Sequence, residues 1–198
     1  MLQFGQSKFL DDLFHQKESG AFIECGALDG ERLSNSLYFE KERHWTGVLI
    51  EANTQFFKKL LQKHRRAFKV NTCLSPGSKA TVLTFTSAGA YGGLVDYGLK
   101  QSIKVTNTRF ESSDIKQCFP LYSILRAAGL THIDLFSLDV EGSEFPILEG
   151  FPWYQKDVTF DVMQIEKSRI PEVIGLLNNQ SYHQIDTPFG RDIIIVKN

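Results

Sequence analysis

Short apolar runs and amphipathic segments alternate along most of the chain. The apolar runs have the length of buried strands and lie at residues 21–25, 45–50, 67–71, 133–138 and 160–165. The segments between and after them space their apolar residues as helices do, at about 33–41, beyond Asn53, and at 121–128, 144–149 and 171–177. Helices between successive strands require parallel pairing with right-handed crossovers, so the pattern predicts an α/β fold.

Two further patterns mark the ends of the chain. Apolar residues at helical spacing from Phe4 to His15 predict a leading helix within residues 1–19. Residues 182–186 and 192–197 predict a closing antiparallel hairpin. Together with the alternating units, this hairpin predicts a three-layer α/β/α arrangement around a mostly parallel seven-stranded sheet, in a single domain of 198 residues.

The alternation is interrupted within residues 75–118. Thr81–Thr86 and Ile103–Phe110 carry β-branched residues in alternation and predict an inserted antiparallel hairpin. A glycine-rich stretch at 87–100 joins them, and we interpret it as a flexible loop that covers the substrate side of a crevice. Tyr91 is a candidate substrate contact in this loop, although a surface hairpin without a role explains the same pattern.

The first apolar run leads into a turn that could bind a ligand. The run contains Glu24, and the turn has glycines at positions 26 and 30. A turn at the carboxyl end of a parallel strand presents backbone N–H groups at the crevice where open α/β sheets bind ligands. No third glycine and no Lys-Ser/Thr pair follow, which argues against a pyrophosphate site. Glu24 and Asp29 would repel a phosphate but could hold a cationic group. Asn35 would cap the following helix or face the same crevice.

A second acidic residue suggests the kind of ligand. Glu51 follows the apolar run at 45–50 and lies 25 positions after Gly26. An acidic residue at this distance, at the end of the next strand, commonly accepts hydrogen bonds from ribose hydroxyls. The combination of Glu24, Gly26, Gly30 and Glu51 therefore points to an adenosine-containing ligand without phosphates.

Three more carboxylates lie at predicted strand ends. Asp139 and Glu141 follow the run at 133–138, and Glu166 follows the run at 160–165. Acids in this position can form a general base, a metal site or a turn with helix caps. The three together could hold Mg²⁺ or Ca²⁺ through oxygen ligands, but no metal is predicted. For Glu166, a structural hydrogen-bonded carboxylate is an alternative reading.

Composition limits the partners and the compartment. A net charge of −1 and a pI near 6.5 give no general attraction to nucleic acid or anionic lipid. No apolar run reaches the length of a membrane span, and no signal-peptide pattern is visible. Cys25, Cys73 and Cys118 form no zinc spacing and no even disulfide framework, which favours a reducing compartment. The sequence therefore predicts a cytoplasmic location without membrane contact, unless an anchor lies outside this chain.

Several segments resemble the FkbM family of S-adenosylmethionine-dependent methyltransferases. They are residues 22–31, 34–40, 45–53, 71–75 and 137–142, in the order in which that family has them. The resemblance covers residues about 20 to 196 and includes Glu24 to Gly30 and Leu138-Asp139-Val140-Glu141-Gly142. Within the family, the chain is similar to the animal branch that includes the protein Star.

The resemblance implies a class I Rossmann-like methyltransferase fold and a particular use of the residues above. It would place the methionine part of S-adenosylmethionine on the turn at 24–30, the ribose on Glu51, and the adenine against residues 72–74. Asp139 and Glu141 would face the transferred methyl group. The implied cofactor-binding residues are Glu24, Gly26, Ala27, Asp29, Gly30, Glu51, Thr72, Cys73, Leu74 and Asp139. The expected substrate contacts are Asn35, Tyr91 and Glu166.

Two functions remain open from this resemblance. Relatives in the family mostly methylate oxygen, which suggests O-methylation of a hydroxyl on a sugar or small molecule. The alternative is a catalytically inactive, Star-like module that keeps the fold to bind a protein partner in trafficking from the endoplasmic reticulum to the Golgi. That alternative would place the chain in the lumen of the secretory pathway or on its membranes.

Overall fold

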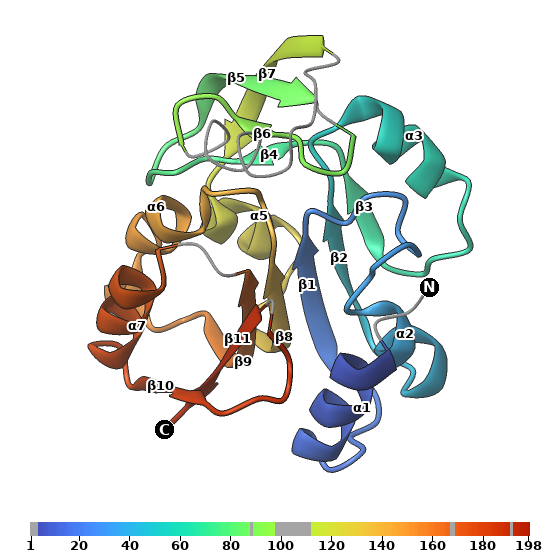
Figure 1. Cartoon of the computed structure of the whole chain (residues 1–198), viewed down its shortest axis with the longest axis vertical. Coiled ribbons are helices and arrows are strands. Elements are labelled where there is room, and N and C mark those ends of the chain that lie inside the picture. The colour runs from blue at the N-terminus through green and yellow to red at the C-terminus, as the bar shows by residue number, and fades with distance from the viewer. Residues whose placement is uncertain (1–3, 88, 98–111, 167–168, 191) are drawn as a thin grey trace.

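The structure is a computed structural model that describes residues 4–87, 89–97, 112–166, 169–190 and 192–198. A seven-stranded sheet with the order β10-β11-β9-β8-β1-β2-β3 lies at its centre (Figure 1). Its strands are β1 (Ala21–Cys25), β2 (Thr46–Ile50), β3 (Phe68–Val70), β8 (His132–Leu138), β9 (Thr159–Glu166), β10 (Tyr182–Ile185) and β11 (Asp192–Lys197). All neighbours pair in parallel except β11, which is antiparallel to both β9 and β10. The predicted mostly parallel sheet with a C-terminal antiparallel hairpin is confirmed.

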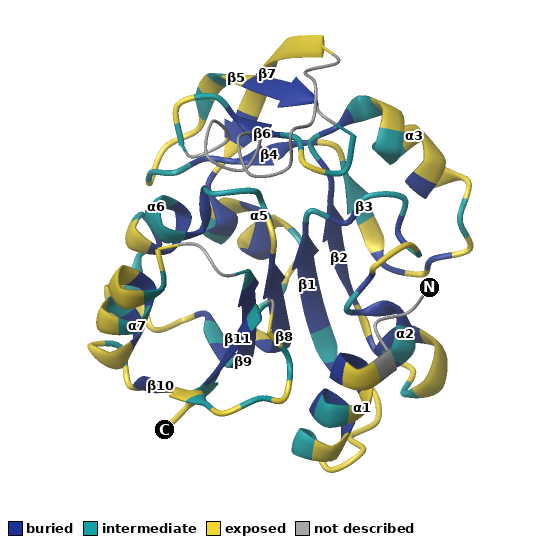
Figure 2. Ribbon diagram, viewed as in Figure 1, coloured by how far each residue is buried: buried dark blue, intermediate teal, exposed yellow. Residues whose placement is uncertain are grey.

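Helices cover both faces of this sheet. One face packs against α1 (Phe4–Leu13), α2 (Leu37–Glu42) and α3 (Thr54–Leu61), and the other against α5 (Leu121–Ala127), α6 (Glu144–Glu149) and α7 (Ile170–Asn178). The central strands are buried on both sides, as Figure 2 shows, because successive side chains such as Phe22 and Ile23 enter opposite cores. A short 3₁₀ helix, Trp153–Gln155, precedes β9. None of the helices in the described part of the chain is long and apolar enough to cross a membrane.

Helix α2 begins later than predicted, at Leu37 rather than near residue 33. The carboxylate of Glu24 explains the delay, because it accepts hydrogen bonds from the backbone N–H groups of Asn35 (2.9 Å) and Ser36 (3.4 Å). Leu33, which precedes the segment 34–36, has a left-handed backbone with φ of 58°. A chain that is tied to β1 in this way cannot start a regular helix until Leu37.

The insertion is larger than the predicted hairpin. It forms a second sheet of four strands, with the order β4 (Cys73–Leu74), β7 (Ser112–Phe119), β5 (Thr81–Ser87) and β6 (Gly93–Leu94). The partner of β5 is β7, and residues 103–110, which we predicted for that role, lie outside the described residues. Cys73 and Leu74, for which no strand was predicted, also pair with β7, in parallel.

The small sheet lies over the carboxyl ends of β1 and β8, at the top of the view in Figure 1. Its buried residues Phe85 and Leu94 form a cluster with Cys73 and Cys118, separate from the two main cores. The insertion therefore covers the edge of the central sheet where the strand-end carboxylates were expected.

Candidate active site

A cavity of about 410 Å³ lies between the carboxyl ends of the central strands and the small sheet. This volume is within the range of roughly 300–1,000 Å³ that is usual for small-molecule sites. Glu24, Glu51 and Asp139 all line it, although they are far apart in the sequence. The parallel register explains the convergence, since Cys25 pairs with both Ile50 and Leu138 at the ends of their strands. The predicted crevice therefore exists, and these three carboxylates meet there.

Glu24 is a buried anchor for the segment before α2. It is 3% exposed, and its carboxylate accepts hydrogen bonds from the hydroxyl groups of Ser34 (2.8 Å) and Ser36 as well as from the backbone of this segment. This arrangement positions Asn35, whose Nδ2 donates to Ser137 Oγ at 2.9 Å. The Oδ1 atom of Asn35 is buried and has no hydrogen-bond partner among the described residues, and Asn35 lines the cavity. Asn35 can therefore accept a hydrogen bond from a ligand.

The glycine at position 26 lets two strands approach each other closely. Gly26 has a φ of 85°, and a Cβ atom here would collide with the backbone carbonyl of Asp139. The N–H groups of Gly26 and Ala27 both donate to Ile50 O, at 3.0 and 3.1 Å. These two N–H groups are therefore used within the fold, whereas we expected the turn to present them to the ligand.

Three predicted cofactor contacts of this turn do not line the cavity. Ala27 is buried in the core on the α1 side of the sheet. Asp29 Oδ1 accepts hydrogen bonds from the backbone of Glu31 (3.0 Å) and Arg32 (2.7 Å), and so stabilises the turn. Gly30 packs against Leu60 with no room for a side chain. Leu28, which was not predicted, does line the cavity.

Glu51 occupies the next strand end with unused acceptor capacity. It is 4% exposed, and each of its oxygens accepts one backbone hydrogen bond, from Leu28 N at 2.7 Å and from Asn53 N at 2.6 Å. Burial raises the pKa of Glu51 to about 7, although these two hydrogen bonds oppose the shift. Because a carboxylate oxygen can accept about two hydrogen bonds, both oxygens can still accept a donor from the cavity.

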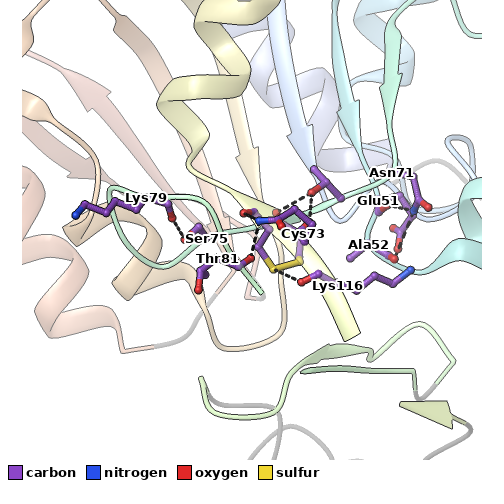
Figure 3. The surroundings of a disulfide bond; sticks show 11 residues. Glu51, Ala52, Asn71, Cys73, Ser75, Lys79, Thr81 and Lys116 are labelled. Atoms are coloured by element: carbon purple, nitrogen blue, oxygen red, sulfur yellow. Dashed lines mark hydrogen bonds between the residues drawn. A yellow bond between two sulfur atoms is a disulfide. The ribbon is translucent and has the colours of Figure 1, made fainter. Parts of the chain in front are cut away.

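Thr72, Cys73 and Leu74 are buried and form an adjoining wall of the cavity. Cys73 forms a disulfide bond with Cys118 (Figure 3), so our expectation of no disulfide is wrong. The two cysteines are 45 positions apart and meet only because β4 pairs with β7. Since disulfides persist mainly in oxidising compartments, the cysteines no longer favour a reducing one. Cys25 is a buried free thiol.

The predicted acids at the ends of β8 and β9 form one cluster. Asp139, Glu141 and Glu166 each offer a carboxylate oxygen, and these atoms lie within 4.8 Å of one another. Asp139 is accessible from the cavity, yet the surrounding protein displaces enough water that burial raises its pKa, and the Glu166 carboxylate raises it further. Burial also raises the pKa of Glu166 to about 7, with contributions from the charges of Glu141 and Glu144. Asp139 and Glu166 are hydrogen-bonded to each other, so the protonation of one depends on that of the other.

Tyr91, predicted as a substrate contact, lines the cavity from the turn before β6 and is 43% exposed. Sequence reasoning missed several other lining residues, namely Arg32, Phe56, Phe85, Gly92, Leu94, Ser137, Ser143 and Asp192. Asp192 pairs with Glu166 across β9 and β11, so the strand-end argument could have found it. Phe85 and Leu94 belong to the insertion, whose position over the sheet the sequence does not reveal.

The sheet order, the closing hairpin and a cavity at the strand ends together define a class I S-adenosylmethionine-dependent methyltransferase fold. The sequence profile of the methyltransferase FkbM domain matches residues 24–187. The chain therefore belongs to the FkbM methyltransferase family. No curated protein matches its sequence.

Solved structures agree with this fold. An FkbM methyltransferase from Methylobacillus flagellatus KT superposes with a TM-score of 0.54 at 15% identity, over 90% of this chain and 43% of that one. A TehB-like methyltransferase from Corynebacterium glutamicum gives a TM-score of 0.51 at 11% identity, over 98% of this chain and 88% of that one. Aeropyrum pernix fibrillarin, with natively bound S-adenosylmethionine, gives a TM-score of 0.52 at 12% identity, over 98% of this chain and 73% of that one. At such identities the likeness establishes the fold alone, and the chain spans less than half the length of the Methylobacillus protein.

Proposed function

We propose that the protein transfers a methyl group from S-adenosylmethionine to a hydroxyl group of a small-molecule acceptor, with sugars as one candidate class. The observation that carries this proposal is the convergence of Glu51, the Gly26 turn and Asp139 on one cavity. Membership of the FkbM methyltransferase family supports it. The cofactor bound to the fibrillarin of similar fold supports the choice of S-adenosylmethionine.

The cavity residues fit this cofactor. Glu51 has acceptor capacity for the two hydroxyl groups of a ribose. Leu74, Phe85 and Leu94 provide an apolar surface of the kind that an adenine ring needs. The carboxylates of Asp139 and Glu141 would attract the positive sulfonium and amino groups at the other end of the molecule. Gly26, Thr72 and Cys73 would contact the cofactor between these groups.

The acceptor would lie beside the acidic cluster. A bound cofactor would supply an activated methyl group on a sulfonium sulfur, so the main task of the protein is to align the acceptor oxygen and exclude water. In its ionised state, the Asp139–Glu166 pair would accept the proton of the acceptor hydroxyl as that oxygen bonds to the methyl carbon. Glu141 would tune the pair through its charge, while Asn35 and Tyr91 would position the acceptor.

A divalent cation is a second way to activate the acceptor at this place. The 4.8 Å grouping of carboxylate oxygens from Asp139, Glu141 and Glu166 favours it, because Mg²⁺ and Ca²⁺ prefer oxygen ligands. Turnover after treatment with EDTA distinguishes activation by the carboxyl pair from activation by a cation. Proton transfer to the carboxyl pair predicts unchanged turnover, whereas a cation predicts loss that Mg²⁺ or Ca²⁺ restores.

The alternative function is a Star-like module that binds a protein partner without catalysis. The Cys73–Cys118 disulfide favours one part of that alternative, a location in the oxidising lumen of the secretory pathway. Calorimetric titration with S-adenosylhomocysteine separates the two functions. Heat of binding supports the methyltransferase, and its absence at high micromolar ligand supports the binding module.

The catalytic assignment is tested by the release of S-adenosylhomocysteine in the presence of hydroxyl-bearing acceptors. Removing a general base typically costs about 10²–10⁴-fold in rate, so we expect such a loss of turnover for Asp139→Asn. Turnover is measured at saturating S-adenosylmethionine, because the Asp139 carboxylate would also attract the cofactor. Glu149→Gln, which removes an exposed acid at the end of α6, is the matched control. Unchanged turnover in both Asp139→Asn and Glu141→Gln would refute the assignment.

A further inference from the structure

The disulfide bond joins β4, the strand of the small sheet that begins two residues after Asn71, to β7 of the same sheet. Cys73 lines the cavity from β4, whereas Cys118 lies on β7, and their Cα atoms are 4.5 Å apart. Just before Cys73, the side chain of Asn71 donates to the backbone carbonyl of Glu51 at 2.7 Å (Figure 3). The bond therefore connects the insertion, through a short segment, to the strand end where the ribose of the cofactor would bind.

Other described contacts also hold β5 and β7 against β4 and the central fold. The β4–β7 pairing comprises two residue pairs. Hydrogen bonds add to it, from Thr72 Oγ1 to Gln117 O at 2.8 Å, from Ser75 N to Phe119 O at 2.8 Å and from Asn53 Nδ2 to Ser87 Oγ at 3.1 Å. Lys116 Nζ on β7 also donates to Thr54 Oγ1 on α3. The two cysteines are also half of the buried residues in the small apolar cluster, together with Phe85 and Leu94. Opening the bond would therefore weaken both the link and the packing beneath it.

We propose that S-adenosylmethionine binding depends on the closed Cys73–Cys118 disulfide, so that the redox state of this pair controls occupancy of the site. The inference rests on the proposed function and adds a mode of regulation to it. Cys73, Phe85 and Leu94 line the cavity, so displacement of the small sheet removes one of its walls. The central sheet and its two cores do not contain these cysteines, and they remain folded when the bond opens.

The redox step needs a thiol reductant from outside the protein. A dithiol transfers two electrons and two protons, forming its own disulfide while Cys73 and Cys118 become thiols. Both cysteines are buried, with exposed fractions of 5% and 0%, so a thiolate reaches the bond only when the small sheet moves away. A bound cofactor would hold that sheet in place and slow the reduction. The coupling is reciprocal, and a tenfold loss of affinity on reduction corresponds to a shift of about 30 mV in the potential of the pair.

The test compares oxidised and reduced forms of the same chain. The protein is produced in an oxidising compartment, and its disulfide is verified by alkylation and mass spectrometry after denaturation, where only Cys25 should react. The affinity for S-adenosylhomocysteine is then measured by calorimetry in three states: before reduction, after reduction with dithiothreitol, and after reoxidation. We expect affinity to fall on the order of tenfold on reduction and to return on reoxidation. Far-UV circular dichroism monitors the central fold.

The double variant Cys73→Ser/Cys118→Ser is the matched control for the reductant. It should bind as weakly as the reduced protein, and dithiothreitol should not change its affinity further, which excludes an effect through Cys25. Equal affinity of the oxidised and reduced forms would overturn this inference and leave the proposed function intact. Three alkylated cysteines in the unreduced protein would also overturn it. Absence of binding to the oxidised protein would overturn the proposed function and this inference together.

Discussion

Replacing Glu51 with glutamine tests whether the buried carboxylate at the end of β2 binds the ribose of the cofactor. In the unliganded protein, the two oxygens of Glu51 already accept hydrogen bonds from Leu28 N and Asn53 N. A carboxylate has about four acceptor positions, which leaves two for the ribose hydroxyls. Glutamine has a single acceptor oxygen for the same four donors, so at least one buried donor loses its partner.

The size of the effect follows from that count. An unpaired buried donor costs about 1–3 kcal/mol, which corresponds to roughly a 5- to 150-fold weaker affinity for S-adenosylhomocysteine. The pH dependence gives a second signature. Burial raises the pKa of Glu51 to about 7, and ribose hydroxyls donate more strongly to the ionised form. Affinity should therefore rise about tenfold between pH 6 and pH 8 in the natural protein and stay nearly constant in Glu51→Gln.

Isothermal titration calorimetry at pH 6, 7 and 8 measures both quantities, and buffers of different ionisation enthalpy count the protons released. An S-adenosylhomocysteine analogue with a 2′-deoxyribose completes a double-mutant cycle. Substitution of Glu51 should weaken the binding of this analogue less than the binding of S-adenosylhomocysteine itself. Glu166→Gln checks that the acidic cluster is not the source of the pH dependence. A pH dependence retained in Glu51→Gln, or equal losses for both ligands, would refute the assignment of the ribose to Glu51.

Three further predictions concern stability and rate. The pKa of Glu51 is about 7 in the folded protein and near 4.5 in the unfolded chain, so the unliganded protein should lose stability as pH rises from about 4.5 to about 7. Melting temperatures at pH 5 and pH 7 measure this loss of stability, which should be smaller in Glu51→Gln. Turnover should increase with pH through about 7, because burial raises the pKa of Glu166 to about 7 and Glu166 then ionises. A pH–rate profile of Glu166→Gln without this rise would support the carboxyl pair as the base. Gly26→Ala should lower the free energy of unfolding by at least about 1–3 kcal/mol in urea titrations, since the positive φ of Gly26 and the carbonyl of Asp139 leave no room for a methyl group. Gly77→Ala is the control. No described atom lies within 4 Å of its added Cβ, so the free energy of unfolding should change little.

The central sheet was predictable because its strands are buried on both faces. In β1, Phe22 and Ile23 enter opposite cores, so the whole run is apolar and stands out from the amphipathic helices. Parallel pairing then places the carboxyl ends of these strands at one edge, and this rule predicts from the sequence that Glu51 and Asp139 line the same cavity.

The small sheet was not predictable by the same reasoning. Most of β7 is exposed, and its sequence, with Asp114, Lys116 and Gln117, reads as a loop rather than a strand. Its partner β4 has only two residues, too few for a periodic signal. The Cys73–Cys118 bond depends on this pairing, and among three cysteines the spacing does not show which two will meet.

The carboxylates around the cavity look equivalent in the sequence, yet their neighbours give them different roles. The oxygens of Glu24 accept hydrogen bonds from Ser34, Asn35 and Ser36, so this residue shapes the site more than it binds a ligand. Glu51 accepts two hydrogen bonds and keeps acceptor capacity for a third and a fourth. Asp139 lies beside the carboxyl group of Glu166, which raises the pKa of Asp139 in addition to the effect of burial. These differences come from donors and acids in segments remote from each strand end, so strand-end position identifies the residues of the site, while the chemistry of each depends on tertiary neighbours.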